Sequence, residues 1–153
     1  MPKLDLAAIP ERNATGYPPP FDEAVAGRWV RRLAPPSKLT EMGVSLVRLE
    51  PGAWSSQRHW HEGEDEFLVM LSGSAVLIDD DGEHDLAPGD CAAFPKGERN
   101  GHHVVNRSDA ACSFLCMSAG ADAGGEYPDI DMRFTPGGYV HKDGTPYPTT
   151  RIK

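Results

Sequence analysis

Two histidines and one glutamate lie close together near the middle of the chain. His59 and His61 are separated by one residue, and Glu66 follows five residues after the second histidine. In an extended strand, side chains at positions i and i+2 share a face, so His59 and His61 point the same way while Trp60 points to the other side. Two imidazoles with a nearby carboxylate are usual ligands of a divalent first-row metal. The spacing therefore predicts a metal site.

Short strands separated by glycine and proline turns surround these residues. Leu68 and Met70 share the face of Glu66 within one apolar run, and Asp81-Gly82 is a strong signal for a two-residue hairpin turn. We expect strands over residues 27–33, 42–49, 66–71, 73–79, 83–86, 91–94, 102–106 and 111–117. Because no helix of amphipathic period separates them, the pattern predicts an antiparallel sandwich or barrel with an interior that can hold a ligand.

Composition and charge exclude several classes of function. The 153 residues fit one domain, and 16 glycines and 14 prolines with only 8% aromatic residues favour short strands over helices. The formal charge of 15 − 23 = −8 argues against binding to nucleic acid or to an anionic membrane. No apolar run approaches the ~20 residues of a membrane span, and the N-terminal segment carries charge where a signal peptide needs an apolar core. We expect a cytoplasmic protein.

The two ends of the chain differ from its middle in their residue pattern. Residues 1–26 contain Tyr17 and three consecutive prolines, which favour a stiff, extended arm. Such an arm could lie across the sheet or cross to a neighbouring subunit. We expect an N-terminal arm over 1–26, a barrel over 27–120 and a C-terminal arm over 121–153 that packs on the barrel.

Two segments carry a resemblance to a known family. Gly52–Gly73 resembles the first signature motif of the cupin superfamily, with His-x-His, four residues, Glu, six residues and Gly. Gly89–Gly97 resembles the start of the second motif, but Asn100 stands where the family has its last histidine ligand. We interpret this as a two-residue insertion that moves the ligand to His102, which keeps the family's spacing to a later asparagine. A β-bulge would instead select His103.

The resemblance implies a fold and a metal site. It implies the cupin double-stranded β-helix, a jelly-roll barrel of two antiparallel sheets, with His59, His61, Glu66 and His102 around one divalent transition metal. Fe, Mn, Ni or Zn would suit these ligands, and open coordination positions would remain for a substrate. The C-terminal part of the chain resembles stand-alone, single-domain bacterial cupins, some of which carry provisional sugar-phosphate isomerase labels.

Two classes of function remain open at this stage. The first is a small-molecule metalloenzyme, isomerase-like or dioxygenase-like, although the presence of Glu66 counts against the thiol dioxygenases that the superfamily contains. The second is a non-catalytic module that binds or senses a small molecule. No catalytic residue can be named beyond the ligands. Arg48, Gln57 and Tyr139 are candidates for substrate binding, and we expect a homodimer with a small-molecule ligand and no nucleic-acid or membrane partner.

Overall fold

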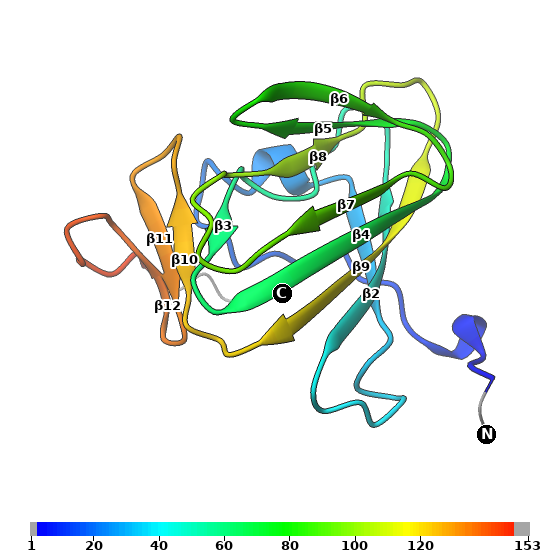
Figure 1. Ribbon diagram of the computed structural model, residues 1–153, viewed down its shortest axis with the longest axis horizontal. Coiled ribbons are helices and arrows are strands. Elements are labelled where there is room, and N and C mark those ends of the chain that lie inside the picture. The colour runs from blue at the N-terminus through cyan, green and yellow to red at the C-terminus, as the bar shows by residue number, and fades with distance from the viewer. Residues whose placement is uncertain (1–2, 149–153) are drawn as a thin grey trace.

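The computed structural model describes residues 3–148, and most of its regular structure is β-strand (Figure 1). Two short 3-10 helices, η1 (Leu6–Ala8) and η2 (Glu23–Val25), lie in the N-terminal segment. The strands are β1 (Arg28–Arg32), β2 (Gly43–Leu49), β3 (Trp60–His61), β4 (Glu64–Ser72), β5 (Ala75–Asp79), β6 (Gly82–Leu86), β7 (Cys91–Phe94), β8 (His103–Val105), β9 (Cys112–Gly120), β10 (Gly125–Tyr127), β11 (Met132–Thr135) and β12 (Gly138–Val140). No helix within residues 3–148 is long and apolar enough to cross a membrane.

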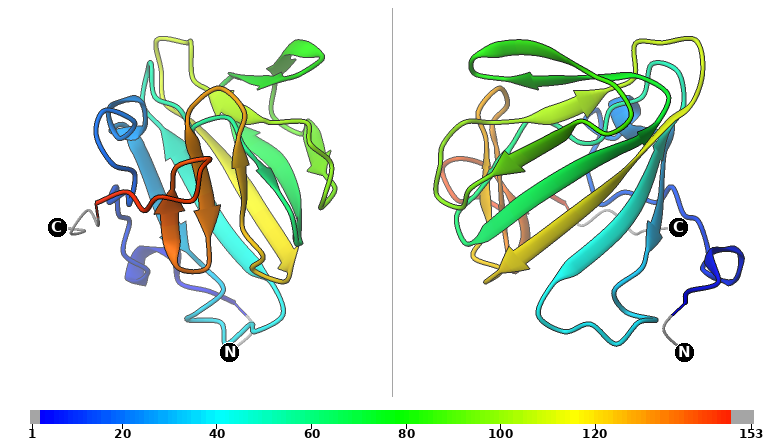
Figure 2. Two further views of the ribbon diagram at one scale, coloured as in Figure 1. Left: turned by 90° about the vertical axis from the view of Figure 1, so that its left-hand side faces the viewer. Right: turned by 45° about the vertical axis from the view of Figure 1, so that its right-hand side comes forward.

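Two antiparallel sheets enclose the main core (Figures 1 and 2). One has the strand order β1-β2-β9-β4-β7, and the other has the order β6-β5-β8. Leu68 and Met70 project from the large sheet into the core, where they meet Leu77 and Val104 of the small sheet. This alternation follows from the period of two in a strand. The predicted jelly-roll architecture is confirmed, and each expected strand overlaps an observed one.

A third sheet forms from the C-terminal part of the chain and one short strand of the barrel. Its order is β12-β11-β10-β3, so Gly125 of β10 lies opposite His61 of β3. A Cβ atom at position 125 would meet the Trp60 carbonyl oxygen at 2.0 Å, so only glycine permits this close approach. The sheet packs on a second core of Tyr17, Val25, Tyr127 and Met132. Residues 149–153 of the expected C-terminal arm lie outside the described residues.

The N-terminal segment runs along the edge of the large sheet. Arg12 and Val30 of β1 exchange two backbone hydrogen bonds of 3.0 and 2.7 Å, which adds one bridge to the free edge of β1. On the outer face, Glu11 accepts two hydrogen bonds of 3.1 Å from the Arg48 guanidinium. Arg31 also holds the segment by donating to two backbone carbonyls near η1. Residues 6–12 are thus fastened to β1 and β2 of their own chain.

Candidate metal centre

Three short segments bring the four predicted ligands together. His59 and His102 face each other across an isolated antiparallel bridge with N–H···O distances of 3.1 and 2.9 Å. Directly paired residues project from the same side of a sheet, so the two imidazoles point the same way. His61 follows on β3, and Glu66 lies on the inward face of β4 beside Leu68. The backbone pairing alone therefore aims all four side chains into the barrel.

The donor atoms of these side chains lie within a few ångströms of one another. The Nε2 atoms of His59 and His61 are 3.1 Å apart. Glu66 Oε2 lies 2.9 Å from His102 Nε2, 3.3 Å from His61 Nε2 and 3.8 Å from His59 Nε2. The four side chains are 8–15% exposed. The donor atoms of His59, His61 and Glu66 thus all lie within 4.8 Å of one another, and His102 joins this largely shielded cluster through its contact with Glu66.

This arrangement fits a divalent first-row metal. Donor atoms that lie at right angles about 2.1 Å from an ion are separated by about 3.0 Å, close to three of the distances here. Two Nε2 atoms at 3.1 Å cannot both carry a proton, whereas a cation between them would satisfy both lone pairs. Four protein donors would leave two positions of a six-coordinate ion for oxygen atoms of a substrate.

Neighbouring groups fix the orientation of two imidazoles. His59 Nδ1 donates to the Gln57 carbonyl oxygen at 3.0 Å and lies 3.2 Å from Ser56 Oγ. Because a carbonyl can only accept, the His59 proton sits on Nδ1 and the Nε2 lone pair is free. The His102 ring stacks on Phe94 with a centroid distance of 3.5 Å and an interplanar angle of 4°. Both rings are held in place before any ion binds.

The protonation states of His59 and Glu66 also favour cation binding, whereas a cation would have to displace the proton from His61. Burial lowers the pKa of His59 to about 3, so this imidazole is neutral at physiological pH. Burial acts to raise the pKa of Glu66, but hydrogen bonds from His102 and His61 outweigh it and hold that pKa well below its usual range. Burial likewise opposes the charged form of His61, and the hydrogen bond and charge of Glu66 overcome it, so that its pKa is raised. The cluster offers one fixed negative charge and a neutral nitrogen donor.

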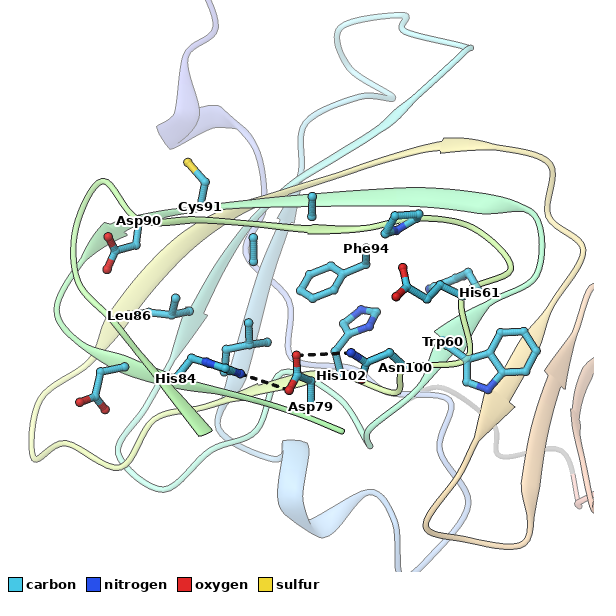
Figure 3. A pocket seen from close by; sticks show the side chains of 16 residues that line it. Trp60, His61, Asp79, His84, Leu86, Asp90, Cys91, Phe94, Asn100 and His102 are labelled. Atoms are coloured by element: carbon cyan, nitrogen blue, oxygen red, sulfur yellow. Dashed lines mark hydrogen bonds and ion pairs between the residues drawn. The ribbon is translucent and has the colours of Figure 1, made fainter. Parts of the chain in front are cut away.

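Two cavities flank the ligands. The first, here called the arginine-lined cavity, has a volume of about 880 Å³ and contains all four ligands together with Arg12, Arg28 and Arg32. The second, here called the acidic cavity, has a volume of about 500 Å³ and lies between β6 and β7 (Figure 3). Its acidic lining residues are Asp79, Asp85, Asp90 and Glu98. His61, Phe94 and His102 line both cavities and form the wall between them.

The three side chains expected to bind substrate do not line the arginine-lined cavity. β2 turns Ser45 and Val47 inward, so Arg48 points outward and pairs with Glu11. Arg48 therefore lies outside this cavity, and a role for it in substrate binding stays a prediction. Gln57 is buried, and its amide nitrogen donates to the Phe21 carbonyl oxygen at 2.9 Å instead of facing the cavity.

Tyr139 and His103 also occupy positions that the sequence did not reveal. Tyr139 stacks on Tyr17 with centroids 5.3 Å apart, and it is Tyr17 that reaches the cavity. His103, the alternative ligand, uses Nδ1 to donate to the Ser56 carbonyl oxygen at 3.0 Å and packs against Trp54. The structure brings His102, and not His103, against Glu66.

The sequence reasoning missed the three arginines of the cavity. Arg28 and Arg32 alternate with Val30 on β1, and Val30 packs against the core. The pattern Arg-x-Val-x-Arg in a strand was therefore a readable signal for two cations on the inner face. Arg12 gave no such signal, because its position depends on the long-range bridge to Val30.

Comparisons with known proteins place this geometry in a family. The model for the cupin domain matches residues 45–118. A cupin-superfamily protein from Silicibacter pomeroyi, described as a sugar phosphate isomerase, is 44% identical, with a TM-score of 0.90 over 99% of this chain and all of that chain.

Two further solved structures are more distant. A protein from Acidithiobacillus ferrooxidans, provisionally described as a sugar phosphate isomerase, is 26% identical, with a TM-score of 0.69 over 82% of this chain and 83% of its own. A cupin conserved barrel domain protein from Salinispora arenicola is 23% identical, with a TM-score of 0.56 over 78% and 87% of the two chains, and shares the fold. No curated protein matches the chain. The full-length match at 44% identity, together with the domain match over the barrel strands, shows that this chain belongs to the cupin superfamily.

Proposed function

We propose that this protein is a metal-dependent isomerase of a small sugar or sugar-phosphate substrate. The observation that carries the proposal is the convergence of His59, His61, Glu66 and His102, with donor atoms as close as 2.9–3.3 Å. The relative from Silicibacter pomeroyi, which is described as a sugar phosphate isomerase, supports the choice of reaction. Fe(II), Mn(II), Ni(II) and Zn(II) all accept this donor set.

The chain supplies the surroundings that such a reaction needs. A bound divalent ion would act as a Lewis acid on a carbonyl or hydroxyl oxygen of the substrate. The four ligands would hold that ion, and Phe94 would keep the His102 ring in its plane. Phe114 and Leu68 line the cavity beside the ligands and would keep bulk water from the reacting carbons. An aldose–ketose interconversion moves one proton between adjacent carbons and one between the oxygen atoms they carry, so it needs no external oxidant.

Metal analysis of the purified protein tests the proposed centre. We expect about one divalent metal ion per chain in the parent and almost none in the His59→Ala, His102→Ala double variant, because two of four donors are gone. His84→Ala is the matched control, since His84 lies on the β6 hairpin next to Asp79 at 3.2 Å and outside the ligand cluster. Equal and negligible metal in the parent and the double variant would overturn the proposal.

The reaction is tested separately by incubating the metal-loaded protein with aldoses, ketoses and their phosphates in deuterated water. Isomerisation with deuterium exchange at the carbon next to the carbonyl is the expected result. If the protein instead contained stoichiometric iron and consumed oxygen, the result would identify a dioxygenase and overturn the proposed isomerase. Saturable binding of one of these sugars without turnover would instead identify a non-catalytic binding module.

We also propose that the chain forms a homodimer through the outer face of the large sheet. Phe67 and Leu71 of β4 point away from the core and are 40% and 48% exposed, and Met42, which lines a surface pocket with Phe67, is 39% exposed. A sheet that is apolar on both faces favours burial of both, and a second copy offers the same apolar face in return. Sedimentation analysis should give a dimer for the parent and a monomer for Phe67→Lys. A monomeric parent would overturn this proposal.

The three segments of the chain would then have distinct tasks. We propose that residues 1–26 complete the wall of the substrate cavity, that residues 27–120 hold the metal and that residues 121–153 pack over one end of the barrel. The docking of Glu11 on Arg48 and the pairing of Gly125 with His61 support this division.

A further inference from the structure

Three arginines face the cavity that holds the candidate ligands. Arg28 and Arg32 are on the inner face of β1, and Arg12 lies opposite Val30 across the bridge, on that same side of the sheet. Glu66 is the one acidic residue among those lining the cavity, and three imidazoles already surround it. The three arginines therefore bring positive charge to the cavity without a further carboxylate to balance it.

None of these arginines has a carboxylate within ion-pair distance in the part of the chain that the structure describes. Arg28 donates from one terminal nitrogen to the Ser55 carbonyl oxygen at 2.7 Å, and its buried Nε has no partner. By contrast, Arg58 and Arg107 each engage carboxylates. Leaving a buried guanidinium donor unsatisfied costs free energy unless a ligand supplies the acceptor.

Arg28 also lies close to the candidate metal centre. Its acceptor, Ser55, precedes Ser56, whose Oγ lies 3.2 Å from His59 Nδ1. The positive charge of Arg28 acts on Tyr17 as well, although burial dominates and raises the pKa of that phenol. Tyr17 lines the same cavity and stays protonated. A single small molecule bound in this cavity can therefore contact both Arg28 and the four candidate metal-binding side chains.

We propose that Arg12, Arg28 and Arg32 form an oxyanion-binding subsite for the phosphate or carboxylate group of the substrate. A planar guanidinium presents paired N–H donors that match the oxygens of either group. The inference rests on the proposed function for its assignment to a substrate, but the subsite itself does not require a bound metal. The N-terminal segment contributes Arg12 and thus completes the subsite on the edge of β1.

The proposal predicts anion binding that depends on these arginines. Inorganic phosphate and malonate would each be titrated into the metal-free protein by calorimetry at low ionic strength. We expect Arg28→Gln to weaken binding of the preferred anion at least about tenfold and Arg12→Gln to weaken it about threefold or more, because charge-assisted hydrogen bonds are lost. Arg107→Gln is the matched control, since Arg107 is exposed and paired with Glu83, and it should bind as the parent does.

The outcomes separate this inference from the proposed function. A preference for phosphate identifies a phosphate ester, and a preference for malonate identifies a carboxylate. Equal binding by the parent, Arg28→Gln and Arg12→Gln would overturn the subsite, as would no binding of either anion by the parent. Because Arg12 is exposed, Arg12→Gln gives a folded variant even if Arg28→Gln does not fold. A parent that binds metal but neither anion would refute the subsite alone, and one that binds an anion but no metal would refute the metal centre alone.

Discussion

The arginine-lined cavity and the acidic cavity share one wall but differ in the use of their charges. In the acidic cavity, Asp79 contacts His84 at 3.2 Å (Figure 3). Asp79 also accepts from the Asp81 backbone at 2.9 Å, and Asp90 accepts from the Ala87 backbone at 2.8 Å. These two of the four acids that line the cavity stabilise the hairpin and the turn that carry them. In the other cavity the arginines have no carboxylate to pair with among the described residues. Asp79 and Asp90 thus serve the local structure, whereas the three arginines face their cavity without a carboxylate partner.

The largest effect, on metal affinity, is expected from removing the negative charge of Glu66 in the arginine-lined cavity. Glu66→Gln keeps the shape of the side chain but takes away the one anionic donor, so the affinity for a divalent metal should fall more than about 100-fold. Competition with a fluorescent chelator measures this. Glu98→Gln, the same change in the acidic cavity, is the control and should leave metal affinity unaltered. A similar loss of metal affinity in Glu66→Gln and Glu98→Gln would contradict the assignment of the metal site to the arginine-lined cavity.

The second largest effect is expected from shortening Phe94, which lies in the wall between the two cavities. Phe94→Ala removes the ring that stacks on His102 and lines both cavities, and it should lower the free energy of unfolding by about 2–4 kcal/mol. Phe94→Leu restores most of the volume and should lose about 1 kcal/mol. Urea unfolding measures both. If the two variants proved equally stable, the ring would not serve as a packed partition.

A smaller effect is expected where the N-terminal segment is fastened to β2. Glu11→Gln should destabilise the protein by about 0.5–1 kcal/mol at pH 7, because the ion pair with Arg48 is partly exposed. The hydrogen bond from Arg48 lowers the pKa of Glu11, so its stabilisation is present above the ordinary pKa of 4.5 and is lost as pH falls through the lowered value.

Thermal unfolding of the parent and Glu11→Gln across pH 3–7 reads out that dependence. The difference in Tm between the two proteins should be present at neutral pH and disappear at the acidic end, where both carry an uncharged side chain. A difference that grows as the pH falls would contradict the assignment.

The smallest effect is expected from neutralising the acidic cavity. Asp85→Asn should change phosphate affinity by less than about twofold at 0.15 M ionic strength, because screening limits its influence on the other cavity to short range. Calorimetric titration of the metal-free variant measures this. A gain of fivefold or more would mean that the anion approaches through the acidic cavity.

Local periodicity explains what the sequence could predict. Glu66, Leu68 and Met70 share an inward face because a strand alternates, and the single residue between His59 and His61 puts both on one side for the same reason. The strands, the sandwich or barrel and the shared face of His59 and His61 follow from such short-range patterns together with turn residues. His102 followed only from the resemblance to the second cupin motif.

The positions of Arg48 and Arg12 could not be predicted, because they depend on which face of a strand is buried and on long-range pairing. β2 carries apolar residues on both faces, with Val44 and Leu46 on one and Val47 and Leu49 on the other, so alternation alone could not decide whether Arg48 points inward. The position of Arg12 is likewise fixed by a bridge to a residue 18 positions away, which no local pattern encodes.

The attachment of the N-terminal segment along the edge of β1 has a consequence for divergence among related proteins. The candidate metal ligands lie between residues 59 and 102, whereas Arg12 reaches the cavity from a segment that precedes the first strand and is held there by only a few contacts. If Arg12 binds the substrate anion as proposed, substitutions in this segment would alter which anion is accepted while leaving the ligand set and the barrel core untouched. The proposed metal centre and this part of the proposed anion subsite would then lie on separate stretches of the chain, so that selection could act on one without disturbing the other.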